Sequence, residues 1–258
     1  MKEVIKMKIK VFSFNIRTDN GSDGINHLPN RLGRIKELID AEQPHIIGFQ
    51  ETREMARKWL SESFSDYTIL GCGRLKGFTG EGVTLAYKKT EFDIVNFGTE
   101  WLSLQPGVPE SFYGGDQSPC PRVLQYALLA PRSGEDAFIF ANVHLDHQGK
   151  DARKLGAMQT MQKLLSMPYK FILTGDFNAT PDDGSIALIR DCIVRKVYDV
   201  TEGLGGTFHN WGQKDVPSKI DYIFTDYDKY ENAHIIADEH PGGVYYTDHY
   251  VVSAEIEI

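Results

Sequence analysis

Apolar and polar positions along the chain alternate in short runs that predict many strands and few helices. KIKVFSFNI alternates as a strand over 8–16, and RLGRIKELIDAEQ has apolar residues at the helical period before Pro44 ends it. Helices are also predicted at 53–64, 151–166 and 185–192. Further strands are predicted at 45–51, 67–70, 83–87, 92–102, 123–130, 138–144, 171–175, 220–225, 234–237 and 251–258.

The connections between these elements indicate how they are arranged. Several strands are joined by turn-rich segments too short to hold a crossover helix, which favours antiparallel pairing. Many strands with two groups of helices indicate two sheets packed face to face, with the helices outside. The 258 residues contain no repeat and no linker, although 105–121 is a long loop rich in proline and glycine. We therefore expect one domain over residues 1–258, with disorder confined to residues 1–6.

The amino-acid composition indicates the class of protein and the cellular compartment to expect. Apolar residues make up 41% and charged residues 25%, as in ordinary globular proteins, and no run of about 18 apolar residues exists to span a membrane. The N-terminal segment lacks the unbroken apolar stretch of a secretory signal. Cys72, Cys120 and Cys192 are odd in number and widely spaced, so they build neither a disulfide framework nor a zinc knuckle. We expect a soluble, cytoplasmic protein with no membrane partner.

The formal net charge of −8 limits the partners of the general surface. Binding of long duplexes depends on lysine and arginine displacing counterions, so a polyanion would have to be met locally. The same charge is compatible with a cluster of carboxylates whose negative potential attracts divalent cations.

Polar residues recur directly after hydrophobic strands, in six segments far apart in the sequence. Each one alone is equally well explained as a turn former or a capped strand end. Together they are what a metal-assisted active site at one rim of a sandwich requires. These residues are Asn15, Gln50, Glu51, His144, Asp146, Asp176, Asn178, Asp221, Asp248 and His249.

The segments SFNIR, GFQET, NVHLDH, LTGDFNATP, KIDYIF and TDH, in this order, resemble the endonuclease/exonuclease/phosphatase superfamily of divalent-metal phosphohydrolases over essentially the whole chain. The resemblance implies an α/β (α+β) fold of the DNase I-like type, a four-layer αββα sandwich of two mostly antiparallel or mixed β-sheets flanked by helices. CPRVLQYALL, HLDHQG and GTFHNW are most similar to an uncharacterised bacterial branch near the deadenylase-type exonucleases.

The chemistry of such a site calls for a hard divalent cation. Mg²⁺, with Mn²⁺ as an alternative, suits carboxylate and amide oxygens and keeps positions open for water. The resemblance implies Glu51 as the principal ligand, Asn15 beside it, and Asp248 at an outer or second metal position. It also implies that Asp176 orients the attacking water or accepts its proton, and that Asn178 donates a hydrogen bond to the phosphate or the nucleophile.

Two histidines complete the implied machinery. His249 would contact the scissile phosphate or act as acid and base, and Asp221 would hold its imidazole in one tautomer and favour the charged form. His144 would approach the phosphate from the other side. Whether Asp176 or His249 is the base stays open, because coupled groups around a metal share their protons.

Other side chains are candidates for substrate contact. Arg122 resembles a phosphate-contacting arginine of the branch, and a surface salt bridge is the alternative. Asp146, His147, Arg153 and His209 are expected at the same mouth, either as substrate contacts or in structural hydrogen bonds. Four aromatic residues are candidates to stack a base or to fill the core: Trp101, Phe112, Tyr113 and Trp211.

Departures from the superfamily bear on the substrate. Arg17 stands where its repair endonucleases usually carry an acid, which argues against a full second metal site. We expect a Mg²⁺-dependent phosphodiester hydrolase, with 3′–5′ exonuclease action on short or single-stranded nucleic acid preferred over endonuclease action. The alternatives are a small-molecule phosphatase or phosphodiesterase and a non-catalytic binding module. A dead module would be expected to lose at least one of Glu51, Asp176, Asp221 and His249, and all four are present.

Overall fold

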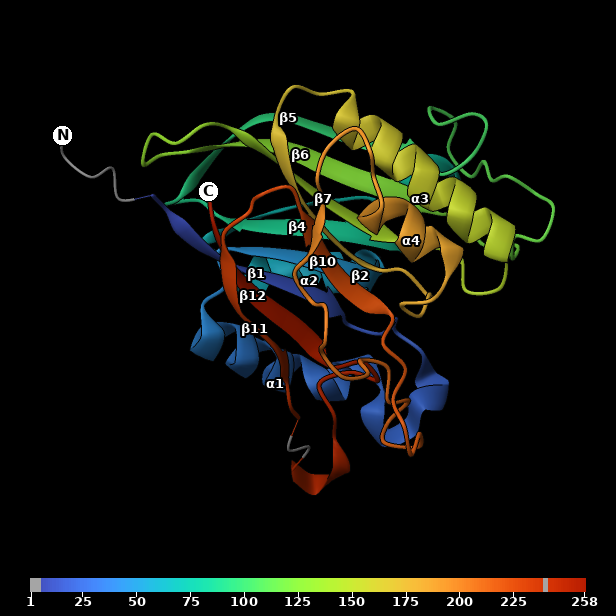
Figure 1. Cartoon of the computed structure of the whole chain (residues 1–258). Helices are drawn as coiled ribbons and strands as arrows, with labels where there is room; N and C mark the ends of the chain where they lie inside the picture. Colours follow the sequence, from blue (N-terminus) through green and yellow to red (C-terminus); the bar gives the residue numbers. More distant parts are fainter. Residues whose placement is uncertain (1–5, 239–240) are drawn as a thin grey trace.

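Two six-stranded β-sheets packed face to face form the centre of the computed structural model, which describes residues 6–238 and 241–258 (Figure 1). Their strand orders are β11-β12-β1-β2-β4-β3 (sheet A) and β5-β6-β7-β8-β10-β9 (sheet B). Sheet A consists of β1 (Lys8–Asn15), β2 (Ile46–Thr52), β3 (Tyr67–Gly71), β4 (Gly82–Lys88), β11 (Tyr230–Ile236) and β12 (Val251–Glu257). Sheet B consists of β5 (Phe92–Trp101), β6 (Val123–Pro131), β7 (Phe138–His144), β8 (Lys170–Asp176), β9 (Tyr198–Asp199) and β10 (Asp221–Thr225).

The helices cover the two outer faces of the sandwich (Figure 1). Sheet A packs against α1 (Leu28–Glu42) and α2 (Glu54–Ser63), and sheet B packs against α3 (Lys150–Leu165) and α4 (Gly184–Arg190). Short 3₁₀ turns lie at η1 (Gly21–Asn26), η2 (Lys76–Phe78) and η3 (Pro241–Gly243). Strands β1 and β2 pair in parallel, as do β7 and β8, whereas the other pairs are antiparallel. The structure confirms the expected αββα sandwich of mixed sheets.

Alternation along the strands divides the core into layers. In β1, Ile9 and Val11 face the space between the sheets, while Phe12 and Phe14 pack against the helices outside. This is the period of two expected for a strand buried on both faces.

Further along the same strands, the layer between the sheets becomes polar. We call Ser13, Gln50, Asn142 and Thr174 the polar belt; all four are buried. The Gln50 amide donates to Asn142 Oδ1 at 2.7 Å, and Thr174 Oγ1 donates to the same oxygen at 3.2 Å. The sheets approach so closely here that a Cβ on Gly48 would lie 1.9 Å from Thr174 Oγ1. The belt ties the two sheets together just below the rim where the polar strand ends meet.

The predicted elements agree with the structure except at the edges of the sheets. Strand β11 begins at Tyr230 rather than at 234; its first three residues, Tyr230, Glu231 and Asn232, are exposed and give no alternating apolar pattern. The two-residue β9 and the 3₁₀ turns are too short for a periodic pattern. Most of the expected disorder at 1–6 falls outside the described residues. Over 6–238 and 241–258, no helix combines the length and the apolar character that a membrane crossing demands.

Candidate active site

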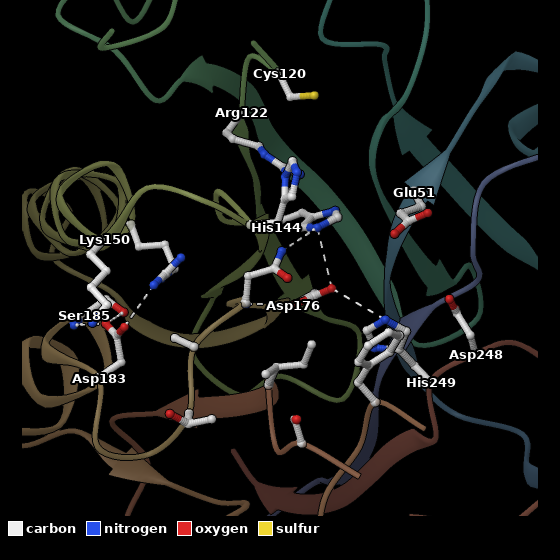
Figure 2. A pocket seen from close by; sticks show the side chains of 18 of the residues that line it. Glu51, Cys120, Arg122, His144, Lys150, Asp176, Asp183, Ser185, Asp248 and His249 are labelled. Atoms are coloured by element: carbon white, nitrogen blue, oxygen red, sulfur yellow. Dashed lines mark hydrogen bonds and ion pairs between the residues drawn. The ribbon is translucent and has the colours of Figure 1, made fainter. Parts of the chain in front are cut away.

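A cavity of about 910 Å³ opens where the polar ends of the strands meet. Figure 2 shows side chains from both sheets pointing into it. Asn15 and Asp221 lie buried directly beneath the cavity and hydrogen-bond to side chains that line it. The predicted site residues that line it are Glu51, Arg122, His144, His147, Arg153, Asp176, Asn178, Asp248 and His249.

Asp176, at the end of β8, is the centre of the cluster. Its Oδ2 accepts a hydrogen bond from Asn15 Nδ2 at 2.9 Å and lies 3.5 Å from His144 Nε2 and 3.8 Å from His249 Nε2. Its Oδ1 accepts the backbone N–H of Asn178 at 2.9 Å. Burial, followed by the nearby charge of Asp221, raises the pKa of Asp176 to about 7. The carboxyl group is therefore poised to exchange a proton near neutral pH.

Glu51 is aimed at the cavity by an irregularity in β2. The register of β2 against β4 shifts between Phe49 and Thr52, and Glu51 has a φ of +62°. A bulge of this kind redirects a side chain, and a left-handed non-glycine residue stores backbone strain. The Thr18 N–H donates to Glu51 Oε2 at 2.8 Å, and Asn15 Nδ2 donates to Oε1 at 3.1 Å. Burial alone would raise the pKa of Glu51, but the Thr18 N–H and the nearby cations lower it, so the group is a carboxylate.

His249 and Asp221 form a buried pair. Asp221 Oδ2 lies 2.8 Å from His249 Nδ1, which directs the other ring nitrogen toward Asp176 and Asn15. Burial lowers the pKa of His249, but Asp221, Asp176 and Asp248 outweigh burial and raise it to about 10. His249 is thus an imidazolium at neutral pH, with one N–H held by Asp221.

His144 differs from His249 in charge. Burial and the positive charges of Arg122 and Arg74 hold the pKa of His144 well below its usual range. Asn178 Nδ2 lies 2.9 Å from His144 Nε2 and donates to the Leu145 carbonyl at 3.1 Å. A neutral imidazole accepts the Asn178 bond at Nε2. The amide hydrogens of Asn178 are therefore engaged within the protein, rather than directed at the cavity as expected.

Two groups of side chains bring potential metal ligands within 4.8 Å of one another: Glu51, His144 and Asp176, and Asp176, Asp221 and His249. The first group fits a hard divalent cation better, because it offers two carboxylates. Asn15 turns Nδ2 toward both of these carboxylates, and its oxygen accepts the Arg17 N–H, so Asn15 positions the ligands instead of offering an oxygen of its own. In the second group, Asp221 and His249 are already bonded to each other. The residues present therefore fit a divalent ion on the Glu51 side of Asp176.

Asp248, expected at an outer or second metal position, lies beside the guanidinium of Arg17. It belongs to neither group, and its Oδ2 lies 3.8 Å from Nε of Arg17, which is also paired with Asp23 at 3.1 Å. The guanidinium of Arg17 thus supplies a positive charge beside Asp248, where an outer or second ion was expected.

Arg122 is a buried cation rather than half of a surface salt bridge. Its nearest carboxylate oxygen, Asp146 Oδ2, lies 3.7 Å away, and its Nη2 is 2.9 Å from His147 Nδ1. Its Nε and Nη1 have no hydrogen-bond partner among the described residues. A buried guanidinium so incompletely paired favours an anionic ligand nearby.

Two other predicted contact residues, Asp146 and Arg153, have structural bonds. Asp146 does not line the cavity, because its carboxylate accepts the Ser118 hydroxyl and the N–H groups of Ser118, Gln148 and Gly149. Arg153 lines the wall while bonding the Asp146 carbonyl and Asp183 Oδ2, both at 3.2 Å.

His209 lies outside the lining and is stacked between aromatic rings. The centroids of Tyr250 and Tyr245 are 4.3 and 5.1 Å from its own, and its Nδ1 accepts the Gly212 N–H. The four aromatic candidates for base stacking also lie outside the lining: Trp101, Phe112, Tyr113 and Trp211.

Several lining residues were missed by sequence reasoning. Phe208 packs against the His249 ring at 4.9 Å between centroids, and Arg74 pairs with Glu81 at 2.8 Å. Thr18 binds Glu51 through its backbone, which no residue type reveals. Phe208 lies within GTFHNW, a segment already noted in the sequence.

The sandwich and its carboxylate–imidazole cluster together define a phosphoester hydrolase. The chain belongs to the Endonuclease/Exonuclease/phosphatase family, whose sequence model matches residues 12–249. Members of this family hydrolyse phosphoester bonds and generally use divalent metal ions, which agrees with the ligand set around Glu51.

Solved structures and one curated relative resemble the chain. An endonuclease/exonuclease/phosphatase from Bacteroides vulgatus is 27% identical with a TM-score of 0.91, covering 98% of this chain and 100% of that one. The mannosyl-6-phosphatase Bt3783 of Bacteroides thetaiotaomicron VPI-5482 is 28% identical with a TM-score of 0.83, covering 97% and 100%. An uncharacterized protein, L388 of Acanthamoeba polyphaga mimivirus, is 28% identical over 156 residues, a match that spans 58% of each chain.

Proposed function

We propose that this protein is a divalent-metal-dependent phosphatase for small, hydroxyl-rich phosphorylated molecules, with sugar phosphates as the leading class. The observation that carries the proposal is the composition of the cavity wall. Among the described residues the lining has seven basic side chains, Arg17, Arg74, Arg122, Lys150, Arg153, Lys154 and Lys214, and seven acidic ones, Glu51, Glu81, Asp151, Asp176, Asp182, Asp183 and Asp248.

Such a wall suits hydroxyl groups better than nucleobases. Carboxylates accept hydrogen bonds, and ammonium or guanidinium groups donate them. Each sugar hydroxyl, which both donates and accepts, therefore finds partners of both kinds in this wall. A base instead needs an aromatic platform, and within the described residues Phe208 is the sole Phe, Tyr or Trp of the lining. The likeness to a mannosyl-6-phosphatase supports the same class. The exonuclease interpretation stays a prediction that the same experiment tests.

The geometry supports a division of labour among the catalytic residues. When bound at Glu51, a divalent ion would neutralise charge on a phosphate oxygen and help to place the reacting groups. Asp176, with a pKa near 7, orients the attacking water and accepts its proton. His249, kept charged by Asp221, donates from Nε2 to an oxygen on which negative charge develops.

The other side of the cavity binds the phosphate. Arg122 points toward the His144 end of the cavity (Figure 2) and carries a charge that no carboxylate neutralises at hydrogen-bonding distance. A phosphate dianion is the ligand that a guanidinium fork matches best. His144, which is neutral and held by Asn178, lies at the same end of the cavity and adds no second positive charge to that of Arg122.

The test is release of phosphate from a substrate panel with Mg²⁺, Mn²⁺ or chelator. The panel holds mannose 6-phosphate, glucose 6-phosphate, glycerol 3-phosphate, AMP and a single-stranded oligonucleotide, with Asp176→Asn as the inactive control. We expect kcat/KM for a sugar phosphate to exceed that for AMP at least tenfold and chelator to abolish turnover.

Two results would replace this proposal. A ladder of shortened oligonucleotides without turnover of sugar phosphates would establish the exonuclease interpretation, with a shallow salt dependence for about one to three phosphate contacts. No turnover of any substrate by protein that binds Mg²⁺ would indicate a non-catalytic module.

A further inference from the structure

Arg31 is a fully buried arginine in α1, and its guanidinium binds backbone carbonyls. Nε donates to the Asn26 carbonyl at 2.6 Å; Nη1 donates to the carbonyls of Ile16 and Tyr246 at 2.8 and 2.6 Å; Nη2 donates to that of Arg17 at 3.1 Å. Burial lowers its pKa only to about 10, so Arg31 is charged at neutral pH. One cation thus joins η1, the segment after β1 and the segment before β12.

The peptide group between Ile16 and Arg17 connects Arg31 to Asn15. Its carbonyl accepts from Arg31 Nη1, and its N–H donates to Asn15 Oδ1 at 2.9 Å. Because the C=O and N–H of a trans peptide point in opposite directions, Arg31 and Asn15 lie on opposite sides of this group. The contact leaves Asn15 Nδ2 to face Glu51 and Asp176.

The next peptide group repeats the arrangement with Glu51. The Arg17 carbonyl accepts from Arg31 Nη2, and the Thr18 N–H donates to Glu51 Oε2 at 2.8 Å. Arg17 has a φ of +55°, a left-handed conformation of the kind that lets successive N–H groups point to the same side, here to the Asn15 amide oxygen and the Glu51 carboxylate. Two consecutive peptides therefore present their carbonyls to one buried cation and their N–H groups to the site.

Because Arg31 binds the carbonyls of the two peptide groups whose N–H groups contact Asn15 and Glu51, it can influence the site as well as the packing of α1. The Glu51 bulge and the left-handed Arg17 are both strained, and strained backbone persists only where surrounding bonds fix it. A positive charge on the carbonyl side also polarises each peptide, which strengthens the hydrogen bond that its N–H donates.

We propose that Arg31 is a positioning residue for the metal site: it fixes the 16–17 and 17–18 peptide groups, whose N–H groups orient Glu51 for the ion and hold Asn15, which in turn bonds Glu51 and Asp176. The inference rests on the proposed metal site at Glu51. Partners that orient metal ligands typically change metal affinity about 10–100-fold when removed. A merely structural Arg31 would change the unfolding midpoint but not the affinity of the protein that remains folded.

The experiment is calorimetric titration of Mn²⁺ and of Mg²⁺ into chelator-treated protein, well below the unfolding midpoint of each variant. The test variants are Arg31→Met and Arg31→Lys, since one ammonium cannot reproduce the planar fork that holds both carbonyls. Arg34→Met is the matched control: Arg34 lies one turn along α1 and binds the Val244 carbonyl and Asp238, without contacting residues 16–18. Glu51→Gln is the reference for the metal site.

We expect both Arg31 variants to bind metal about 10–100-fold more weakly and Arg34→Met to bind as wild type. If Arg31→Met does not fold, Arg31→Lys carries the test. Wild-type affinity in a folded Arg31 variant, with Glu51→Gln impaired, would overturn the role of Arg31 alone. Unchanged affinity in Glu51→Gln would overturn the metal site on which the inference rests.

Discussion

Replacing Asp221 by asparagine tests whether the buried carboxylate sets the charge of His249. The pKa of His249 stands at about 10 against an ordinary 6.5, a difference worth about 5 kcal/mol in favour of the imidazolium. Asp221, at 2.8 Å, is the largest of the influences that raise it. Burial opposes the charge, whereas Asp176 and Asp248 still favour it, so without Asp221 we expect the His249 pKa to fall toward its ordinary value of about 6.5.

The expected loss of activity has two parts. At pH 7.5, a pKa of 6.5 leaves about one imidazole in ten charged, which alone lowers kcat about tenfold. The neutral ring also loses the partner that fixes its tautomer, and removal of such a carboxylate from a catalytic histidine has cost up to about 10⁴-fold in hydrolases. We therefore expect kcat to fall by about 10²–10⁴ in Asp221→Asn, with part of the loss recovered at pH 6.

Two measurements check this reasoning. Imidazole NMR titration of chelator-treated protein gives the His249 pKa without a substrate, and phosphate release from the preferred substrate gives kcat. Asp226→Asn is the control, since Asp226 is a buried acid just beyond the other end of β10, paired with Arg195. A His249 pKa that stays near 10 in Asp221→Asn would refute the assignment. So would an Asp221→Ala/His249→Ala double variant whose loss equals the product of the single losses, because a functional unit is non-additive.

Three further outcomes follow from the charges at the site. Asp176→Asn should raise the unfolding midpoint of metal-free protein, because the raised pKa of Asp176 destabilises the folded state increasingly from about pH 4 to 7. Thermal melts should therefore show a higher midpoint for the variant at pH 8 and no difference near pH 4, and an equal gain at both pH values would contradict this. Arg122→Met should lower kcat/KM at least tenfold without lowering the thermal unfolding midpoint of ligand-free protein, because a poorly paired buried cation contributes little stability. Strong destabilisation would instead show that Asp146 forms a stabilising ion pair with Arg122. Turnover should fall as pH rises through about 10, where His249 loses its proton, and a rate that is flat from pH 8 to 11 would exclude a required imidazolium.

The sequence predicted the fold well because its strands are buried on both faces and bounded by turns. It also placed Asn15, Glu51, Asp176 and His249 together, since the first three stand at the ends of hydrophobic strands and His249 stands just before the last strand. The charge of Arg17 beside Asp248 was not predicted, because it depends on a left-handed backbone that no periodicity reveals. Contacts made by peptide groups, such as the Thr18 N–H on Glu51, were equally invisible, because they carry no side-chain signature.

The separation between the strand ends and the surrounding loops has an evolutionary consequence. Asn15, Glu51 and Asp176 sit at the ends of strands cross-linked by the polar belt, whereas much of the charged wall comes from outside the sheets, from the loops that enter α3 and α4 and from the first turns of these helices, over 147–154 and 180–185. Insertions and substitutions in such segments are tolerated far better than changes in a core strand. New substrate preferences can therefore arise by exchanging wall segments while the reaction chemistry is inherited unchanged, and a family whose name joins nucleases with phosphatases is what this division would produce.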